Sequence, residues 1–172
     1  MSTDFDPTPH VDQLARTHRA VEALLRGIDM ESATWRPPDG AWSLLEIARH
    51  LLDEERRDFR PRLEHTLRDP LEAWEPVDPE RWAREERYHD RPLDDVLDEF
   101  ASERDASLAW LGEFASPDWG RSHRFQGWDF AASEILGAWA AHDVLHIRQI
   151  AKRLYQLGEC KVGGAARYAG EI

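Results

Sequence analysis

The chain has 172 residues, of which 41% are hydrophobic and 33% are charged, a composition typical of one soluble domain with a buried core. Its formal net charge of −12 argues against nucleic acid as a partner, because phosphate binding needs a basic face. No apolar run approaches the ~20 residues that span a bilayer, and the acidic N-terminus does not resemble a signal peptide. We therefore expect a cytoplasmic protein without a membrane segment. The single cysteine, Cys160, agrees, because it cannot form an internal disulfide.

Two helices are predicted in the first part of the chain. The first covers about residues 10 to 29, where apolar side chains recur at helical spacing and His18 falls on the same stripe. The second begins at Ser43, where "SLLE" is a capping box, and extends to about residue 67. Pro61 lies inside this span and predicts a kink or an early end there.

Two further helices are predicted, each after a long connection. Residues 68–91 hold prolines, aromatics and many charges; a loop of this length is often functional, either as a lid or as a partner surface. The third helix covers about residues 92 to 115. A second connection, "SPDWGRSHRFQGWDF", leads to the fourth helix, about residues 129 to 157, with Gly158 as its C-cap.

The fold expected from these elements is all-α. No segment shows sustained alternation at period 2, and four long amphipathic segments are typical of a four-helix bundle. We expect a single domain over residues 1–172, with irregular ends at 1–9 and 158–172.

The fourth helix carries two histidines, His142 and His146, in the stretch "HDVLH". They are about 40° apart around the axis and roughly 6 Å apart along it, which suits two ligands of one metal ion. This spacing alone is weak evidence. The histidines lie beside Trp139, a candidate pocket residue, on the apolar arc of the helix, so they should point inward. Asp143 falls further inside that arc and needs a partner, for which the free N–H of a metal-bound histidine is a natural candidate.

The second helix offers a matching ligand, His50, on a face that also carries apolar side chains. Two histidines from one helix and one from another make a three-His site for a divalent ion, with a position left open for water or substrate. Neutral imidazoles suit both zinc and nickel. Glu54 lies one turn beyond His50, and three interpretations are open for it: a fourth ligand, a general base, or a salt-bridge partner of Arg57 or Arg104.

The stretches "WSLLEIARHLLDEE" and "HDVLHIRQI" resemble the two motifs of the DinB-like family, which includes the YfiT-type proteins. The resemblance covers about residues 10 to 157 and implies a four-helix bundle with a divalent metal on His50, His142 and His146. The lead-in Trp42 and Ser43, together with Glu46 and Gln149, fit the motifs as well. Residues 68–91 and the tail after 158 match no motif.

The same resemblance bears on function. Some relatives are S-transferases or isomerases that use a low-molecular-weight thiol, and others have been called hydrolases. We therefore predict a metal-dependent enzyme acting on a small molecule, with thiol transfer as the first interpretation and hydrolysis by metal-bound water as the second. Asp143 would orient a ligand histidine, and Glu54 is the candidate for proton transfer. A non-enzymatic metal-binding or dimeric stress-linked bundle is the third interpretation, and the resemblance also implies a homodimer.

Three further residues are candidates for the pocket. His18 is more often a hydrogen-bonded core or pocket-wall histidine than a ligand. Arg104 interrupts the apolar stripe of the third helix, where an ion pair across the bundle is a commoner role than a contact with a substrate anion. His123 precedes the fourth helix, where a lid or mouth residue would sit, although a solvated loop histidine is the simpler interpretation. The remaining histidines, His10, His65 and His89, follow no pattern.

Overall fold

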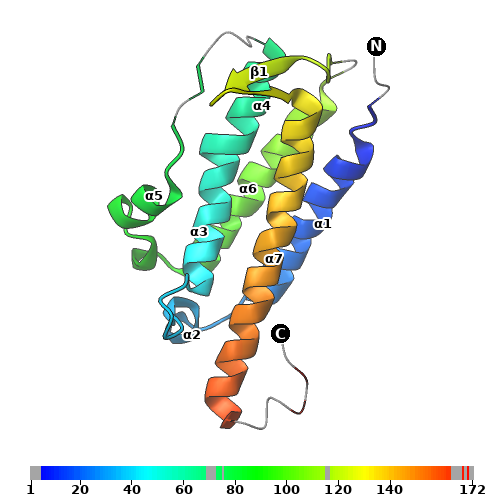
Figure 1. The fold of residues 1–172 in the computed structure, drawn as a ribbon. Helices are drawn as coiled ribbons and strands as arrows, with labels where there is room; N and C mark the ends of the chain where they lie inside the picture. Colours follow the sequence, from blue (N-terminus) through cyan, green and yellow to red (C-terminus); the bar gives the residue numbers. More distant parts are fainter. Residues whose placement is uncertain are drawn as a thin grey trace.

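The chain folds as a four-helix bundle with two elaborated connections (Figure 1). The computed structural model describes residues 5–68, 73–74, 76–114, 117–163, 168 and 170. The bundle consists of α1 (Thr8–Leu25), a continuous rod made of α3 (Leu44–Glu54), η1 (Glu55–Phe59) and α4 (Arg60–Arg68), α6 (Leu93–Gly112) and α7 (Ala132–Val162). Smaller elements decorate it: α2 (Met30–Thr34), α5 (Pro79–Glu85), η2 (Tyr88–Asp90) and the strands β1 (Ser122–Phe125) and β2 (Trp128–Ala131).

Within the central rod, α3 is the most enclosed helix. All eleven residues of α3 are buried, because α2, α5, η2, α6 and α7 surround this helix. Leu44, Leu51 and Leu52 fill the apolar core on one side. The other sides of α3 bury polar groups, among them His50 and Glu54. Buried polar groups need partners, so this helix is where functional chemistry is to be sought.

The sequence predicted either a kink or an early end of the second helix at Pro61, and the rod continues past this residue. A five-residue π-helical turn, Glu55–Phe59, lies just before the proline and joins α3 to α4. Proline has no backbone N–H to donate to the preceding turn, and a wider turn is one way for a helix to absorb that loss. The turn places Glu55 and Asp58 in the interior, where both are buried.

The ends of two bundle helices differ from the prediction. α1 ends at Leu25, because Gly27 has a φ of 79°, and the short helix α2 follows with Asp29 as its N-cap. α7 continues through Gly158, which was predicted as its C-cap, and ends at Val162. The positive φ of 61° that closes the helix belongs to Gly163 instead.

Both long connections contain secondary structure. In residues 76–91, α5 and η2 pack on α3 through the buried Trp82 and Tyr88. The second connection forms a β-hairpin that was not predicted, with Ser122 opposite Ala131 and Phe125 opposite Trp128. Its two-residue turn has positive φ at both positions, 50° at Gln126 and 88° at Gly127, as tight hairpins require. Strands of four residues are too short to show sustained alternation, which is why the pattern was missed.

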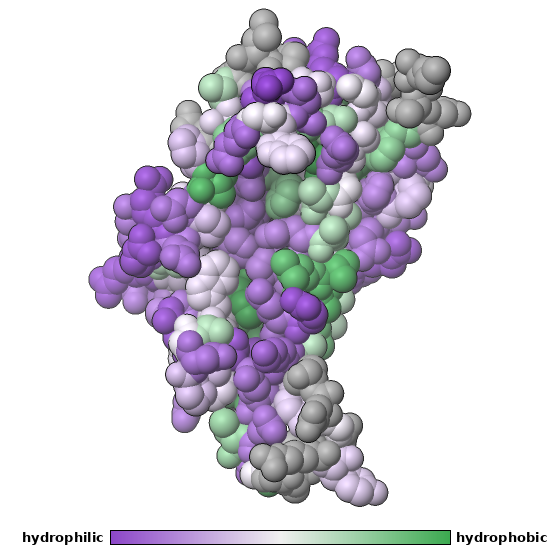
Figure 2. Space-filling view, viewed as in Figure 1, coloured by the Kyte–Doolittle hydropathy of each residue, from purple (hydrophilic) through white to green (hydrophobic). Residues whose placement is uncertain are grey.

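Hydrophilic side chains cover most of the face shown in Figure 2, and apolar patches interrupt it over the middle of α7, where Val144 and Leu145 are exposed. Within the described residues, no helix combines the length and the apolar character needed to cross a membrane.

Candidate metal centre

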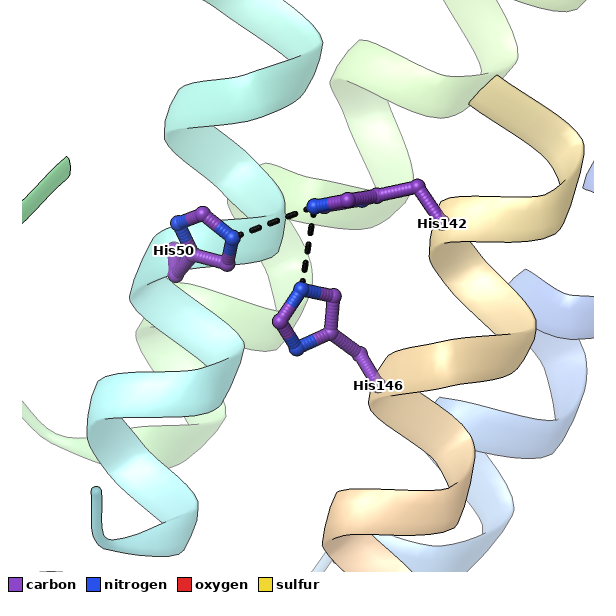
Figure 3. Close-up of side chains that lie close together, drawn as sticks. All are labelled: His50, His142 and His146. Carbon is purple, nitrogen blue, oxygen red and sulfur yellow. Dashed lines mark hydrogen bonds between the residues drawn. The ribbon is translucent and has the colours of Figure 1, made fainter. Parts of the chain in front are cut away.

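The structure brings together the three histidines that the sequence singled out. His50 projects from α3 and meets His142 and His146, which lie one turn apart on α7 (Figure 3). The Nε2 atom of His142 is 3.3 Å from Nε2 of His50 and 3.0 Å from Nε2 of His146. One ligand atom from each ring lies within 4.8 Å of the others. The three imidazoles therefore converge through the same type of nitrogen.

This geometry fits a metal ion. Tetrahedral coordination at a metal–nitrogen distance of about 2.0–2.1 Å places neighbouring ligand nitrogens about 3.3 Å apart. The Nε2 separations at His142 are close to that value. Gln149 Oε1 lies 2.9 Å from His146 Nδ1 and accepts its hydrogen, so Nε2 of neutral His146 turns a lone pair towards the cluster.

Burial keeps the three rings in the form that binds metals. It lowers the pKa of His50 to about 2, with the neighbouring histidines adding to the effect. It lowers the pKa of His142 to about 4, again with His146 adding to it, and it also lowers the pKa of His146. Neutral imidazole is the ligand form of histidine, so no proton has to be removed from these rings at neutral pH.

The outer nitrogens of the rings have different surroundings. His146 is held by Gln149, as described above. The Nδ1 atom of His50 faces Glu54 Oε1 at 3.6 Å, slightly beyond hydrogen-bond distance. The Nδ1 atom of His142 is buried with no hydrogen-bond partner within the described part of the chain. The sequence therefore predicted which three histidines meet, while the contacts of their outer nitrogens differ from those expected.

Glu54 lies behind His50, next to Nδ1 rather than next to the converging Nε2 atoms. Burial, together with the adjacent carboxyl of Asp58, with which it shares a hydrogen bond, raises its pKa to about 9. Neither predicted arginine pairs with it: Arg57 binds Asp53 and Glu86, and Arg104 binds Glu55. The salt-bridge interpretation of Glu54 is wrong, and its place behind the ring corresponds to a support for His50.

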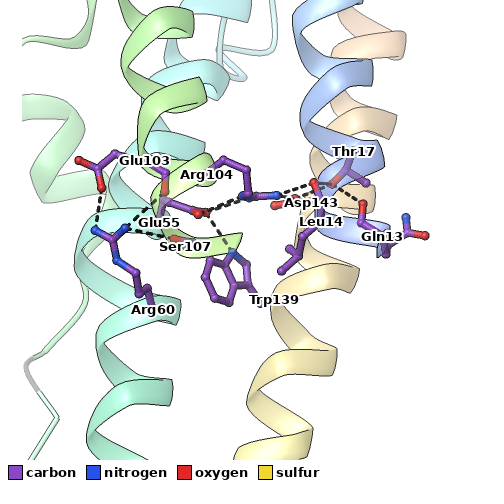
Figure 4. A network of polar contacts seen from close by, with 10 residues as sticks. All are labelled: Gln13, Leu14, Thr17, Glu55, Arg60, Glu103, Arg104, Ser107, Trp139 and Asp143. Atoms are coloured by element: carbon purple, nitrogen blue, oxygen red, sulfur yellow. Dashed lines mark hydrogen bonds and ion pairs between the residues drawn. The ribbon is translucent and has the colours of Figure 1, made fainter. Parts of the chain in front are cut away.

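Asp143 does not hold a ligand histidine through a hydrogen bond, contrary to the prediction. Its Oδ2 accepts hydrogen bonds from Arg104 Nη1 at 2.6 Å and from Thr17 Oγ1 at 2.7 Å (Figure 4). Arg104 is fully buried and also binds Glu55 through two hydrogen bonds of 3.0 and 2.8 Å. The two carboxylates raise the pKa of this guanidinium although burial opposes them. An ion pair across the bundle, the commoner of the two predicted roles, is confirmed for Arg104.

Trp139 and His18 also belong to the interior rather than to an open pocket. Trp139 is 1% exposed, donates from Nε1 to Glu55 at 3.2 Å and stacks on Phe59. His18 packs edge-on against Phe100, and its Nε2 has no hydrogen-bond partner among the residues that the structure describes. His18 is not part of the histidine cluster.

His123 is not the solvated loop residue that its position suggested. It lies on β1, is 5% exposed, and stacks on Trp74 with a ring separation of 4.4 Å. Trp74 in turn contacts Phe125 and Phe130 of the hairpin. His123 thus belongs to an aromatic group that covers the upper end of the bundle.

Two cavities are lined by residues that contact the histidine cluster. A cavity of about 480 Å³, here called the cationic cavity, is lined by Arg148, Lys152 and Arg153 together with Trp42 and Gln149. Trp42 packs on the ring of His50 and Gln149 binds His146, so this cavity adjoins the histidines directly.

The second cavity, of about 220 Å³, lies on the hairpin side of the histidines and is here called the aromatic cavity. Its lining includes Phe59, whose ring centroid is 5.0 Å from that of His142, and Asp58, the partner of Glu54. Sequence reasoning missed both residues. Asp58 follows Glu54 by four positions, the same interval that separates Glu54 from His50, and this repeated spacing was the available signal.

Comparisons with known proteins agree with this architecture. Residues 13–150 match the family model of the DinB superfamily. The fold is similar to that of YfiT from Bacillus subtilis, described as a probable metal-dependent hydrolase with an unusual four-helix bundle topology; the TM-score is 0.79 at 16% identity, over 91% of this chain and 90% of that one. No curated protein matches the chain. The structural likeness establishes the fold, and the family match spans most of the sequence: the chain belongs to the DinB superfamily.

Proposed function

We propose that this protein is a metal-dependent enzyme whose divalent ion is held by His50, His142 and His146. The observation that carries the proposal is the convergence of three neutral Nε2 atoms in a buried pocket. Within the described residues, no carboxylate joins the group, so the protein supplies three ligands and leaves a position open for a small molecule. The description of YfiT as a probable metal-dependent hydrolase supports the proposal.

The residues around the ion have defined tasks in this proposal. Gln149 fixes the ring of His146, and Glu54 supports His50 from behind. When bound, a zinc or nickel ion would lower the pKa of a thiol or water at the open position. Phe59 and Trp42, which pack on His142 and His50, limit the access of bulk water to the rings.

The reaction that we favour is a transfer that uses a low-molecular-weight thiol. Glu54 faces the far side of His50 and is badly placed to take a proton from a group held at the Nε2 side. A thiol needs no such base, because coordination itself deprotonates it. Cavities on both sides of the histidines also leave room for two separate substrates.

Hydrolysis is the second candidate, and the description of YfiT is the observation that favours it. It would use one organic substrate and water. The two candidates therefore differ in whether a thiol is consumed.

Metal content tests the site itself. We expect about one divalent ion per chain in protein purified without added metal or an affinity tag, and its loss in His50→Ala and His142→Ala. His89→Ala, an exposed histidine outside the cluster, is the matched control and should keep the ion. Undiminished metal in both cluster variants would overturn the proposal.

The reaction class is tested on the cobalt-substituted protein. Cysteine, used as a small thiol, should change the visible absorption of the bound cobalt, and the loaded enzyme should join thiols to electrophiles in a product screen. An unchanged spectrum, combined with ester cleavage in the absence of any thiol, would reject thiol transfer and favour hydrolysis.

A further inference from the structure

The aromatic cavity has a composition unlike the rest of the surface of this acidic protein. Its walls come from η1, the segment before α5, the hairpin and α7. Five aromatic side chains and an exposed alanine define it: Phe59, Trp74, Phe125, Trp128, Phe130 and Ala138. Figure 2 shows this face hollowed below the hairpin, between α4 and α7, with apolar side chains visible in the hollow.

The rings in this wall are held in place by their neighbours. The guanidinium of Arg62 lies 4.7 Å from the ring centroid of Trp74 and 5.0 Å from that of Phe125. Arg62 is anchored in turn by Asp58 of the π-helical turn. His123 stacks on Trp74 and so supports the ring further. A wall built in this way is preorganised, which reduces the entropic cost of binding a ligand.

The cavity lies beside the histidine cluster. Phe59 contacts both the cavity and the ring of His142, and Ala138 lies one helical turn before His142 on α7. The cationic cavity meets the histidines from the other side, through Trp42 and Gln149.

The volume limits what fits. A cavity of about 150 Å³ is known to hold one benzene molecule. The aromatic cavity measures about 220 Å³, which is enough for one ring with a short substituent.

We infer that the aromatic cavity binds the single aromatic ring of the substrate and presents its substituent to the metal centre. The role of the cavity in holding a substrate rests on the proposed function. The binding of an aromatic ring rests on the cavity alone. Offset and edge-on contacts with the surrounding rings favour an aromatic ligand over a saturated ring of similar size by about two- to tenfold in affinity.

The test compares benzyl alcohol with cyclohexylmethanol by saturation-transfer NMR on the full chain, in metal-free and in metal-loaded protein. Benzyl alcohol should bind in both forms and should bind more tightly than the saturated compound. Equal affinity for the two probes would overturn the aromatic preference, and no binding of either would overturn the site.

Two variants locate the binding. Ala138→Phe places a ring in the cavity from an exposed helix position, and should weaken benzyl alcohol binding at least about tenfold because it fills the space. Trp128→Ala removes one wall of the cavity, an indole that is 73% exposed, and should weaken binding of benzyl alcohol several-fold. Ala23→Phe makes the same change at an exposed alanine of α1 and should leave binding unchanged.

The outcomes separate this inference from the proposed function. If benzyl alcohol binds as expected but the protein holds no metal, the aromatic binding site is supported and the proposal of a metal-dependent enzyme is rejected. If the protein holds metal but Ala138→Phe and Ala23→Phe bind the probe equally, the aromatic site fails and the metal centre stands.

Discussion

Asp143 follows His142 directly in the chain, yet its carboxylate is bound by Arg104, with Nη1 only 2.6 Å from Oδ2. The same guanidinium binds Glu55, so one cation from α6 joins a carboxylate of the central rod to one of α7 (Figure 4). Because Asp143 lies on the same helix as two of the histidines, this buried pair also positions α7 relative to α3.

Removing Arg104 should therefore destabilise the fold strongly. Arg104→Met would leave Glu55 and Asp143 buried without their cation, and we expect a loss of about 3–5 kcal/mol in the free energy of unfolding. Arg26→Met removes a partly exposed arginine paired with Asp98 and should cost about 1 kcal/mol or less. Urea unfolding measures both. A cost for Arg104→Met no larger than that of the control would show that the pair does not stabilise the bundle.

The hydrogen bond between Gln149 and His146 should tune metal affinity. Gln149→Leu keeps the approximate volume but removes the acceptor for Nδ1–H, and we expect the dissociation constant for zinc to rise about 10- to 100-fold. Gln156→Leu makes the same substitution further along α7, where Gln156 binds Arg153, and should leave the affinity unchanged. Competition with a zinc chelator is the measurement. Equal affinities in the two variants would contradict a supporting role for Gln149.

Glu54 should act as a support for His50 and not as a fourth ligand. Burial and Asp58 raise its pKa to about 9, so it is protonated at neutral pH in the metal-free protein and resembles glutamine in shape and charge. Glu54→Gln should therefore retain about one metal ion per chain and the same visible spectrum with cobalt. A cobalt spectrum that shifts on this substitution would instead indicate direct coordination by the carboxylate.

The histidine cluster should stabilise the metal-free protein less in mild acid than at neutral pH. Burial lowers the pKa of His142 to about 4, whereas a histidine in the unfolded chain titrates near ~6.5. Between these values the unfolded chain binds a proton that the folded protein does not, so the stability present above pH ~6.5 is lost as the pH falls towards 4. His50, with a pKa of about 2, continues the loss at lower pH.

Urea unfolding at pH 7.5 and pH 5 tests this dependence. Metal-free wild type should lose more free energy of unfolding between the two values than His142→Gln does, by an amount on the order of 1–2 kcal/mol. Glu54 contributes in the opposite direction, since its raised pKa removes stability as the pH rises from its unfolded value of about 4.5 through 9, but this contribution is common to both proteins. Parallel pH profiles would contradict the assignment of a depressed pKa to His142.

Much of the candidate site could be read from the sequence because its ligands lie on long helices. A turn of helix places His142 over His146, and the capping box at Ser43 sets the start of the helix that carries His50. Local periodicity then predicts that these side chains share an inward face. The tight turn at Gln126 and Gly127 also depends on neighbouring residues, but its four-residue strands are too short to show an alternating pattern.

The periodicity of the sequence could not predict the partners of the buried charged groups. Asp143 was predicted to serve a histidine and Glu54 to pair with an arginine, and each has another neighbour in the structure. Which residues of two helices come into contact depends on the crossing angle and the axial register of those helices. The spacing of residues within one helix specifies neither.

The sequence by itself therefore determined the bundle, the inward faces of its helices and the three histidines that meet. Only the tertiary structure decided that Arg104 forms an ion pair with Asp143 and that Glu54 lies next to Nδ1 of His50. It also decided that the hairpin lines an aromatic cavity beside His142. The physical reason is that helix formation depends on neighbours within a few positions, whereas the choice of a partner for a buried charge depends on which groups lie within about 3 Å after packing.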